Sequence, residues 1–168
     1  MKLSSLEELV RTLNAEGVPF LVVGGLAVNA HGYGRQTADI DLIVPLDPAT
    51  IDRAFRALET MGYHPSVPVS AADLADAERR SRLATEKGMT VIGFCSETHW
   101  ETPVDLFTSE PFDFTREYDR ALVEEVAPGV PVRIVQLDTL IRLKRAAARP
   151  QDLADIAELH FLHGWVDG

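Results

Sequence analysis

The chain has 168 residues, of which 46% are hydrophobic and 25% are charged, and its formal net charge is -10. This length and composition are typical of one globular domain and exclude a collagen-like, repetitive or largely disordered chain. The longest apolar run, residues 20–28, has about half of the ~20 residues that a membrane helix needs, and the excess of negative charge argues against extensive binding of duplex DNA.

The first third of the chain predicts helices and strands in alternation. Apolar residues recur at helical spacing near the N-terminus, where Ser5 and Glu8 are placed as a capping box. Residues 20–23 form a continuous apolar run of the kind found in buried strands, and a Gly-Gly pair ends it. The predicted elements are a helix over 3–17, a strand over 20–23, a short helix over 26–31, a strand over 40–44 and a helix over 47–61.

The rest of the chain predicts further strands and a helical C-terminal third. Prolines over 64–69 favour a loop, and two short apolar runs separated by a polar turn predict a hairpin or a strand pair. The predicted elements are a helical segment over 71–87, strands over 89–94, 104–107 and 130–135, and two helices within about 137–163. This order predicts a mixed α/β domain of the α+β class that spans residues 1–168, with a sheet core at about 18–135 and helices packed on it.

Two aspartates interrupt the strand predicted at 40–44. Because side chains at i and i+2 of a strand face the same side, Asp39 and Asp41 should project together while Ile40 and Leu42 enter the core. Paired carboxylates repel each other, and keeping both ionised requires a compensating cation. Hard oxygen ligands of this kind suit Mg²⁺ or Mn²⁺, which bridge carboxylates and substrate phosphates. The pattern therefore predicts metal-dependent phosphate chemistry.

A glycine pair, Gly24-Gly25, precedes these aspartates by thirteen residues. Two glycines between a buried strand and a short helix let a backbone approach a phosphate closely, and amide N–H groups at a helix start favour an anion. A Gly-Gly pair by itself is more often a turn, and an Asp-x-Asp by itself is usually solvated. Their combination favours a functional site, because burying unpaired charge in a strand is costly.

These motifs resemble the nucleotidyltransferase superfamily with the DNA polymerase β-like fold. The matching residues are Val23-Gly24-Gly25 and the stretch Arg35-Gln36-Thr37-Ala38-Asp39-Ile40-Asp41-Leu42. Within the superfamily the chain looks most like small bacterial proteins related to AbiEii-type toxins, and its tail, residues 140–156, is similar to their helical ending. The resemblance covers residues 1–60 closely and residues 100–160 loosely.

The resemblance implies a nucleotidyltransferase-type mixed sheet that carries a third carboxylate on a neighbouring strand. Asp105 matches best, because it is again a charge within an apolar run, whereas its rivals Glu97 and Glu101 lie in a polar turn. Asp39, Asp41 and Asp105 are then the expected catalytic residues and metal ligands. They would hold two Mg²⁺ or Mn²⁺ ions between the acceptor hydroxyl and the triphosphate.

The resemblance also implies which residues bind the nucleotide. Gly24 and Gly25 would cradle the triphosphate, and Arg35 and Thr37 lie in the loop before the aspartates, where an arginine fork can reach a phosphate. Lys144 on a C-terminal helix is the leading candidate for neutralising the triphosphate, because the resembling toxin-type enzymes place a lysine in such a helix. Its rivals are Arg142, Arg145 and Arg149.

The activity implied by the resemblance is transfer of a nucleoside monophosphate from an NTP to a hydroxyl or phosphate acceptor, with release of pyrophosphate. The acceptor is a tRNA or a protein, as in toxin-type relatives, or a small antibiotic, as in aminoglycoside and lincosamide nucleotidyltransferases. A competing hypothesis is a non-catalytic nucleotide-binding protein that has kept the fold. A cognate antitoxin and a homo-oligomer are further candidate partners.

The N-terminus and the cysteine content both favour the cytoplasm. The first ten residues, MKLSSLEELV, carry acidic side chains where a signal peptide would have its apolar region. Cys95 is the single cysteine, which excludes an intramolecular disulfide and a cysteine-based metal site and fits a reducing compartment. We therefore expect a cytoplasmic protein without a membrane segment.

Overall fold

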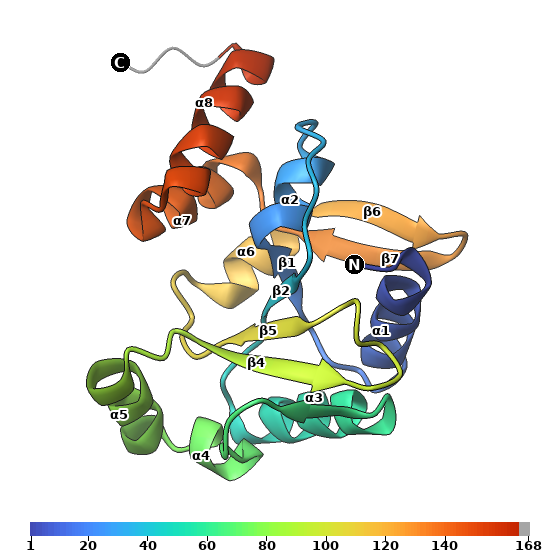
Figure 1. Cartoon of the computed structure of the whole chain (residues 1–168), viewed down its shortest axis with the longest axis vertical. Coiled ribbons are helices and arrows are strands. Elements are labelled where there is room, and N and C mark those ends of the chain that lie inside the picture. Colours follow the sequence, from blue (N-terminus) through green and yellow to red (C-terminus); the bar gives the residue numbers. More distant parts are fainter. Residues whose placement is uncertain (165–168) are drawn as a thin grey trace.

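The computed structural model describes residues 1–164, in which helices and strands alternate along the chain (Figure 1). The helices are α1 (Leu3–Ala15), α2 (Gly24–Ala30), α3 (Pro48–Thr60), α4 (Ala71–Ala75), α5 (Ala77–Lys87), α6 (Phe114–Arg120), α7 (Leu137–Ala147) and α8 (Pro150–His163). The strands are β1 (Leu21–Val23), β2 (Ile40–Ile43), β3 (Tyr63–Pro65), β4 (Val91–Ser96), β5 (Val104–Phe107), β6 (Leu122–Ala127) and β7 (Val130–Ile134).

The strands of residues 1–164 form one seven-stranded mixed sheet in the order β3-β4-β5-β2-β1-β7-β6. Strand β2 runs parallel to β5 and antiparallel to β1, and β1 runs parallel to β7. The pairs β3–β4, β4–β5 and β6–β7 are antiparallel. The mixed α+β architecture expected from the sequence is confirmed, and the expected strand pair is β4 with β5.

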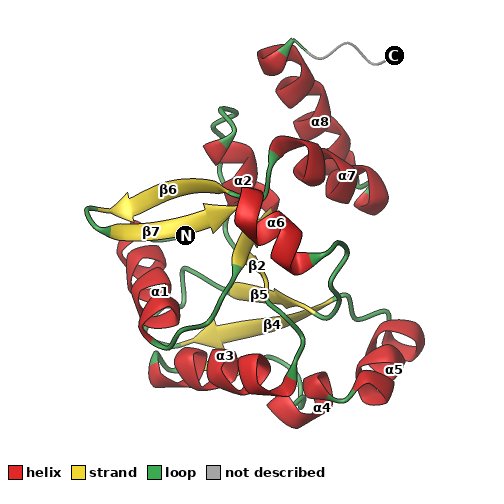
Figure 2. Cartoon of the chain, turned by 180° about the vertical axis from the view of Figure 1, so that it is seen from behind, coloured by secondary structure: helices red, strands yellow, loops and turns green. Residues whose placement is uncertain are grey.

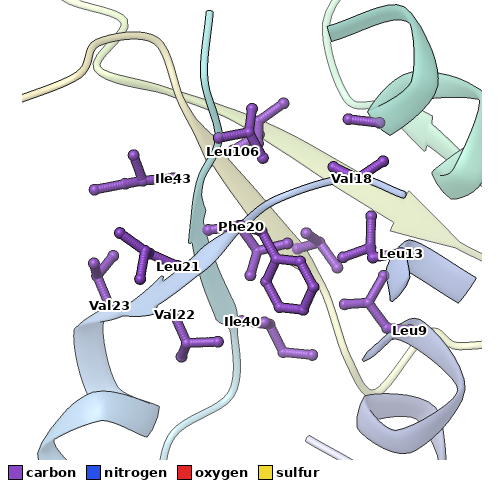
Figure 3. Close-up of a cluster of buried hydrophobic side chains, with 14 of the residues drawn as sticks. Leu9, Leu13, Val18, Phe20, Leu21, Val22, Val23, Ile40, Ile43 and Leu106 are labelled. Atoms are coloured by element: carbon purple, nitrogen blue, oxygen red, sulfur yellow. The ribbon is translucent and has the colours of Figure 1, made fainter. Parts of the chain in front are cut away.

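The hydrophobic core includes side chains from both faces of the central strands. Figure 3 shows Leu9 and Leu13 of α1 beside Phe20, in one cluster with Ile40 of β2 and Leu106 of β5. All five side chains are buried, and burying each one contributes roughly 1.5–3 kcal/mol. Strand β1 is buried along its whole length, as its unbroken apolar run predicts.

Six of the remaining helices lie toward opposite ends of the molecule, with α6 between them. In both Figure 1 and Figure 2, α2, α7 and α8 lie at one end and α3, α4 and α5 lie at the other. No helix within residues 1–164 is long and apolar enough to cross a membrane.

Two segments in the middle of the chain differ from the sequence expectations. The loop expected over 64–69 begins inside β3, where Pro65 is tolerated because β3 is an edge strand of the sheet. The single helix expected over 71–87 is two helices. Asp76 separates them, because its backbone is extended and its side chain caps α5 by accepting a hydrogen bond of 2.9 Å from the backbone N–H of Arg79.

The expected capping box is wrong. Helix α1 begins after Lys2, whose side chain makes no capping bond, and the buried Ser5 hydroxyl lies 2.9 Å from Nδ1 of His99 instead. Sequence patterns also do not predict β6 or α6. The Pro128-Gly129 turn closes a hairpin between β6 and β7, since Gly129 has a φ of +75°.

Candidate functional site

The aspartates that the sequence singles out meet on one face of the sheet. The parallel register of β2 and β5 makes Asp41 and Asp105 direct partners, and both alternate with buried neighbours. Asp39 stands two residues before Asp41, directly ahead of β2, and its charge acts on both other carboxyls. The rivals Glu97 and Glu101 lie exposed in the turn between β4 and β5. The fold therefore pairs Asp41 with Asp105 and keeps Asp39 near enough for its charge to act on both.

The three carboxylates are poorly neutralised by the rest of the protein. Burial, followed by the charges of Asp105 and Asp39, raises the pKa of Asp41 from 3.8 to about 6. Burial and the charge of Asp39 also raise the pKa of Asp105. The backbone N–H of Gly25 and the Arg149 guanidinium lower the pKa of Asp41, but they do not offset the other effects. Such a cluster favours any added cation.

The glycine pair allows close packing around Asp41. Gly24 has a φ of +64°, and a Cβ built on it would overlap the Asp41 carboxylate. A Cβ on Gly25 would overlap the side chain of Thr37 and come within 3.4 Å of Arg35 Nη1. Both positions thus require glycine because other parts of the protein approach them closely. Helix α2 begins at Gly24, two residues earlier than the sequence predicts.

Arg35 and Thr37 lie in the loop between α2 and β2. The Arg35 guanidinium donates two hydrogen bonds to Asp155 of α8, from Nε at 2.7 Å and from Nη2 at 2.8 Å. Its Nη1 donates to the carbonyl of Gln36 at 3.0 Å. The Thr37 hydroxyl lies 3.5 Å from the carbonyl oxygen of Asp39. The arginine fork is therefore occupied by bonds that tie this loop to α8.

Lys144 of α7 is buried between two carboxylates of α8. Its Nζ lies 3.0 Å from Asp152 Oδ1 and 2.7 Å from Asp155 Oδ2. Asp152 also caps α8 by accepting a hydrogen bond of 3.2 Å from the backbone N–H of Arg149. Lys144 and Asp152 thus join α7 to α8, and Lys144 is not among the charges that act on Asp41 or Asp105.

Arg149 is the cation that the fold turns toward the carboxylates. It follows α7 after Ala148, a residue in the left-handed conformation with a φ of 50°. Its side chain is 76% exposed and forms an ion pair of 2.7 Å with Asp152. Its charge lowers the pKa of both Asp41 and Asp105. From the sequence, Arg149 is only an alternative to Lys144 as the residue that neutralises the triphosphate. The one local feature that distinguishes Arg149 is its position directly before the predicted last helix, at Pro150.

The carboxylates are the type of ligand that a hard divalent cation prefers, although they do not form a complete set of metal ligands by themselves. Within residues 1–164, no three His, Cys, Asp or Glu side chains are close enough together to hold a metal ion. Like charges repel, and Asp41 is turned toward the amide of Gly25. Carboxylate oxygens without a fixed cage are typical of sites where substrate phosphates complete the coordination of Mg²⁺.

Comparison with known proteins decides the type of fold. No protein-family model and no curated protein matches the sequence. The solution structure of the antibiotic-resistance factor ANT(2'')-Ia matches with a TM-score of 0.61 at 14% identity, over 95% of this chain and 82% of that one. The fold is of the nucleotidyltransferase type.

Two further solved structures agree with this. The crystal structure of ANT(2'')-Ia in complex with adenylyl-2''-tobramycin matches with a TM-score of 0.58 at 13% identity, over 95% of this chain and 87% of that one. An antigenic nucleotidyltransferase-like protein from Paracoccidioides brasiliensis matches with a TM-score of 0.56 at 18% identity, over 95% and 75%. These likenesses concern the nucleotidyltransferase fold as a whole, so the narrower resemblance to AbiEii-type proteins stays a prediction.

Proposed function

We propose that the protein is a metal-dependent nucleotidyltransferase that moves a nucleoside monophosphate from an NTP to a hydroxyl or phosphate acceptor and releases pyrophosphate. The observation that carries the proposal is the pairing of Asp41 with Asp105 in adjacent parallel strands, with Asp39 beside them. A carboxylate whose pKa is raised by burial and by neighbouring carboxylates, as that of Asp41 is, is a candidate for a functional site. The nucleotidyltransferase fold supports the same reaction class.

Asp39, Asp41 and Asp105 are the proposed metal ligands and catalytic residues, with Mg²⁺ or Mn²⁺ as the proposed ion. A divalent cation bound there would neutralise the carboxylates and the triphosphate and would polarise the attacking oxygen. Asp105, on the strand farther from the glycine pair, would orient the acceptor hydroxyl and accept its proton.

We propose that the cationic residues near the site have different roles in nucleotide binding. Arg149 would contact the triphosphate, because its charge already acts on Asp41 and Asp105 and its side chain is exposed. Gly24 and Gly25 would keep the backbone at the start of α2 close to the phosphates. The predicted phosphate contacts of Arg35, Thr37 and Lys144 stay proposals. Ion pairs with Asp155 give Arg35 and Lys144 a structural role as well.

Calorimetric titration of ATP with and without Mg²⁺ tests this proposal. The wild-type chain should bind ATP only with the metal, and Asp105→Asn should reduce transfer more than it reduces binding, since the nucleotide keeps Asp39 and Asp41. Asp52→Asn, on the exposed surface of α3, is the matched control. Absence of metal-dependent binding in the wild type would favour a non-catalytic protein that has kept the fold.

The acceptor divides the proposal into two candidates. A tRNA or protein acceptor follows from the toxin-type resemblance. An aminoglycoside follows from the likeness to ANT(2'')-Ia, a structure of which holds adenylyl-2''-tobramycin. Incubation with radiolabelled NTPs separates them, because label would move to RNA or protein of a cell extract in the first case and to added tobramycin in the second.

A further inference from the structure

Several arginines line a pocket that shares no residue with the cluster of Asp39, Asp41 and Asp105. Helix α6, the turn before it and helix α7 line a solvent-open pocket of about 290 Å³, which we call the α6–α7 pocket. Three arginines line it, Arg116 and Arg120 from α6 and Arg142 from α7. The ring of Phe112 forms an apolar part of its wall. In a chain with a net charge of -10, three arginines around one cavity require an explanation.

Three carboxylates also line the pocket, those of Asp113, Glu117 and Asp138, and the last two are bound to Arg120 and to α7 or the residue before it. Glu117 is buried and accepts hydrogen bonds from the backbone N–H of Gln136 at 2.9 Å, from Arg120 Nε at 2.7 Å and from the Thr139 hydroxyl at 3.0 Å. Asp138 accepts from Arg120 Nη2 at 2.7 Å and from the backbone N–H of Thr139 at 2.8 Å. Arg120 is therefore fixed between these two acids and holds α6 against α7.

The other two arginines keep most of their donors available. Within residues 1–164, the Arg116 guanidinium has no hydrogen-bond or ion-pair partner, and the Asp113 carboxylate accepts only the Arg116 backbone N–H, at 3.0 Å. Arg142 makes one bond, from Nη2 to the Thr139 hydroxyl at 2.8 Å. An arginine carries five N–H donors.

Four exposed arginines elsewhere on the helices are paired with acids. Each of the following forms an ion pair of 2.6 to 3.2 Å with an acid on its own helix or the adjoining one: Arg11 with Glu7, Arg56 with Asp52, Arg79 with Asp73, and Arg82 with Glu78. Arg116 lacks such a pair although acidic residues outnumber basic ones in the chain. The Arg116 guanidinium thus lines the pocket without an ion-pair partner among residues 1–164.

We propose that the α6–α7 pocket binds a small oxyanion, such as a phosphate or pyrophosphate group, through Arg116 and Arg142. Planar guanidinium forks from two helices match the oxygens of such an anion, and charge-assisted hydrogen bonds of this type are among the strongest in proteins. The volume lies at the lower end of the range for small-molecule pockets, which suits one or two phosphate groups better than a larger ligand. This inference does not depend on the proposed transferase activity.

Titration of ¹⁵N-labelled full-length protein with sodium pyrophosphate, in EDTA and at low salt, tests the site by NMR. Without metal, the three aspartates repel the anion, so binding should shift the arginine side-chain Nε–H signals of Arg116 and Arg142. Arg116→Gln and Arg142→Gln should each weaken binding by about tenfold. Arg56→Gln, an equal change of charge on α3, should leave binding unchanged. Inorganic phosphate and citrate titrations distinguish a preference for phosphate from one for carboxylate.

The variants should keep the fold, because Arg116 lacks partners in the described chain and Arg142 loses one hydrogen bond. Their thermal unfolding midpoints report this directly. The proposal is overturned if the wild type binds none of the three anions, or if Arg116→Gln binds pyrophosphate as tightly as the wild type. It is also overturned if Arg149→Gln abolishes binding and Arg116→Gln does not, since the anion would then occupy the aspartate site.

Discussion

Asp155 and Asp41 are both aspartates with little exposure, yet Asp155 is enclosed by cations and Asp41 lies among other carboxylates. Burial raises the pKa of Asp155, but hydrogen bonds from Arg35 and Lys144 outweigh it, so its net pKa lies below the ordinary value. Burial raises the pKa of Asp41 to about 6, and the charges of Asp105 and Asp39 add to this effect. One cluster is neutralised within the fold and the other is left for a ligand.

This difference separates two roles for buried charge. The cluster of Lys144, Asp152, Asp155 and Arg35 joins α7, α8 and the loop before β2, so its energy is part of folding. The cluster of Asp39, Asp41 and Asp105 costs folding energy unless a cation is added. We call these the first and the second cluster. If this comparison is right, removing one charge from the first cluster should destabilise the protein, and removing one charge from the second should stabilise it.

The largest effect is expected at Lys144. Lys144→Met keeps the length of the side chain but leaves Asp152 and Asp155 with a missing partner. Breaking a buried ion pair on one side typically costs about 3–5 kcal/mol, so we expect a loss of that size in the free energy of unfolding, measured by urea denaturation. Lys87→Met, at the exposed end of α5, is the control. A loss below about 1 kcal/mol would show that the cluster does not stabilise the fold.

A smaller loss is expected at Gly24, where the second cluster meets the backbone. Gly24→Ala places a side chain at a φ of +64° and against Asp41, so we expect a loss of about 2–3 kcal/mol in the free energy of unfolding. Gly17→Ala is a matched control, because Gly17 has a φ of +63° and nothing within 4 Å of the added Cβ. It should lose only about 1–2 kcal/mol. Equal losses in the two variants would show that the backbone conformation alone, and not contact with Asp41, accounts for the effect at Gly24.

Asp41→Asn should have the opposite sign. Because the pKa of Asp41 rises to about 6 on folding, the folded state holds the proton more tightly than the unfolded state between about pH 4 and pH 6. The free energy of unfolding of the wild type therefore loses the contribution of Asp41 as the pH rises through this range. Asparagine does not ionise, so the variant does not show this loss. At pH 7 we expect the variant to be more stable than the wild type by about 3 kcal/mol, and at pH 4 to be nearly equal to it.

Two measurements sharpen this prediction. Asp155→Asn, in the paired cluster, should instead destabilise the protein at pH 7, because Asp155 has a lowered pKa and two cationic partners. Added Mg²⁺ should narrow the gap between the wild type and Asp41→Asn if the cation binds the second cluster. A difference in stability between the wild type and Asp41→Asn that stays constant between pH 4 and pH 7 would contradict the raised pKa of Asp41.

The second cluster is the one that the sequence predicts well. Asp41 and Asp105 each interrupt a short apolar run, and the period of two in a strand is enough to place both on one face. That β2 and β5 are adjacent requires the fold, which the resemblance supplied. The glycine pair is also visible in the sequence, but its close contact with Asp41 and Thr37 depends on how the loop before β2 packs.

The first cluster could not be predicted from the sequence. Lys144 looks like any lysine of an amphipathic helix, and its burial results from the packing of α7 on α8, which places Asp152 and Asp155 around it. Arg35 is similarly separated from Asp155 by 120 residues. Ion pairs between distant segments carry no local pattern. For this reason the sequence assigns both cations to a phosphate, while the structure shows them bound to carboxylates.

Arg149 connects the two clusters, and its loss is expected to affect stability least. The residue forms an ion pair with Asp152 and its charge acts on Asp41 and Asp105. Because its side chain is 76% exposed, Arg149→Gln should lower the free energy of unfolding by less than about 1 kcal/mol. Removing its charge should raise the pKa of Asp41 above about 6, which carboxyl ¹³C NMR titration can follow.

The same variant separates the structural role of Arg149 from its proposed role toward the nucleotide. If Arg149 contacts the triphosphate, affinity for ATP with Mg²⁺ should fall about tenfold in Arg149→Gln, although the fold is nearly unaffected. Arg149→Lys keeps the charge but not the fork, so it should preserve the pKa of Asp41 and recover only part of the affinity. Full ATP affinity in Arg149→Gln, together with the raised pKa of Asp41, would show that Arg149 neutralises the aspartates without contacting the triphosphate.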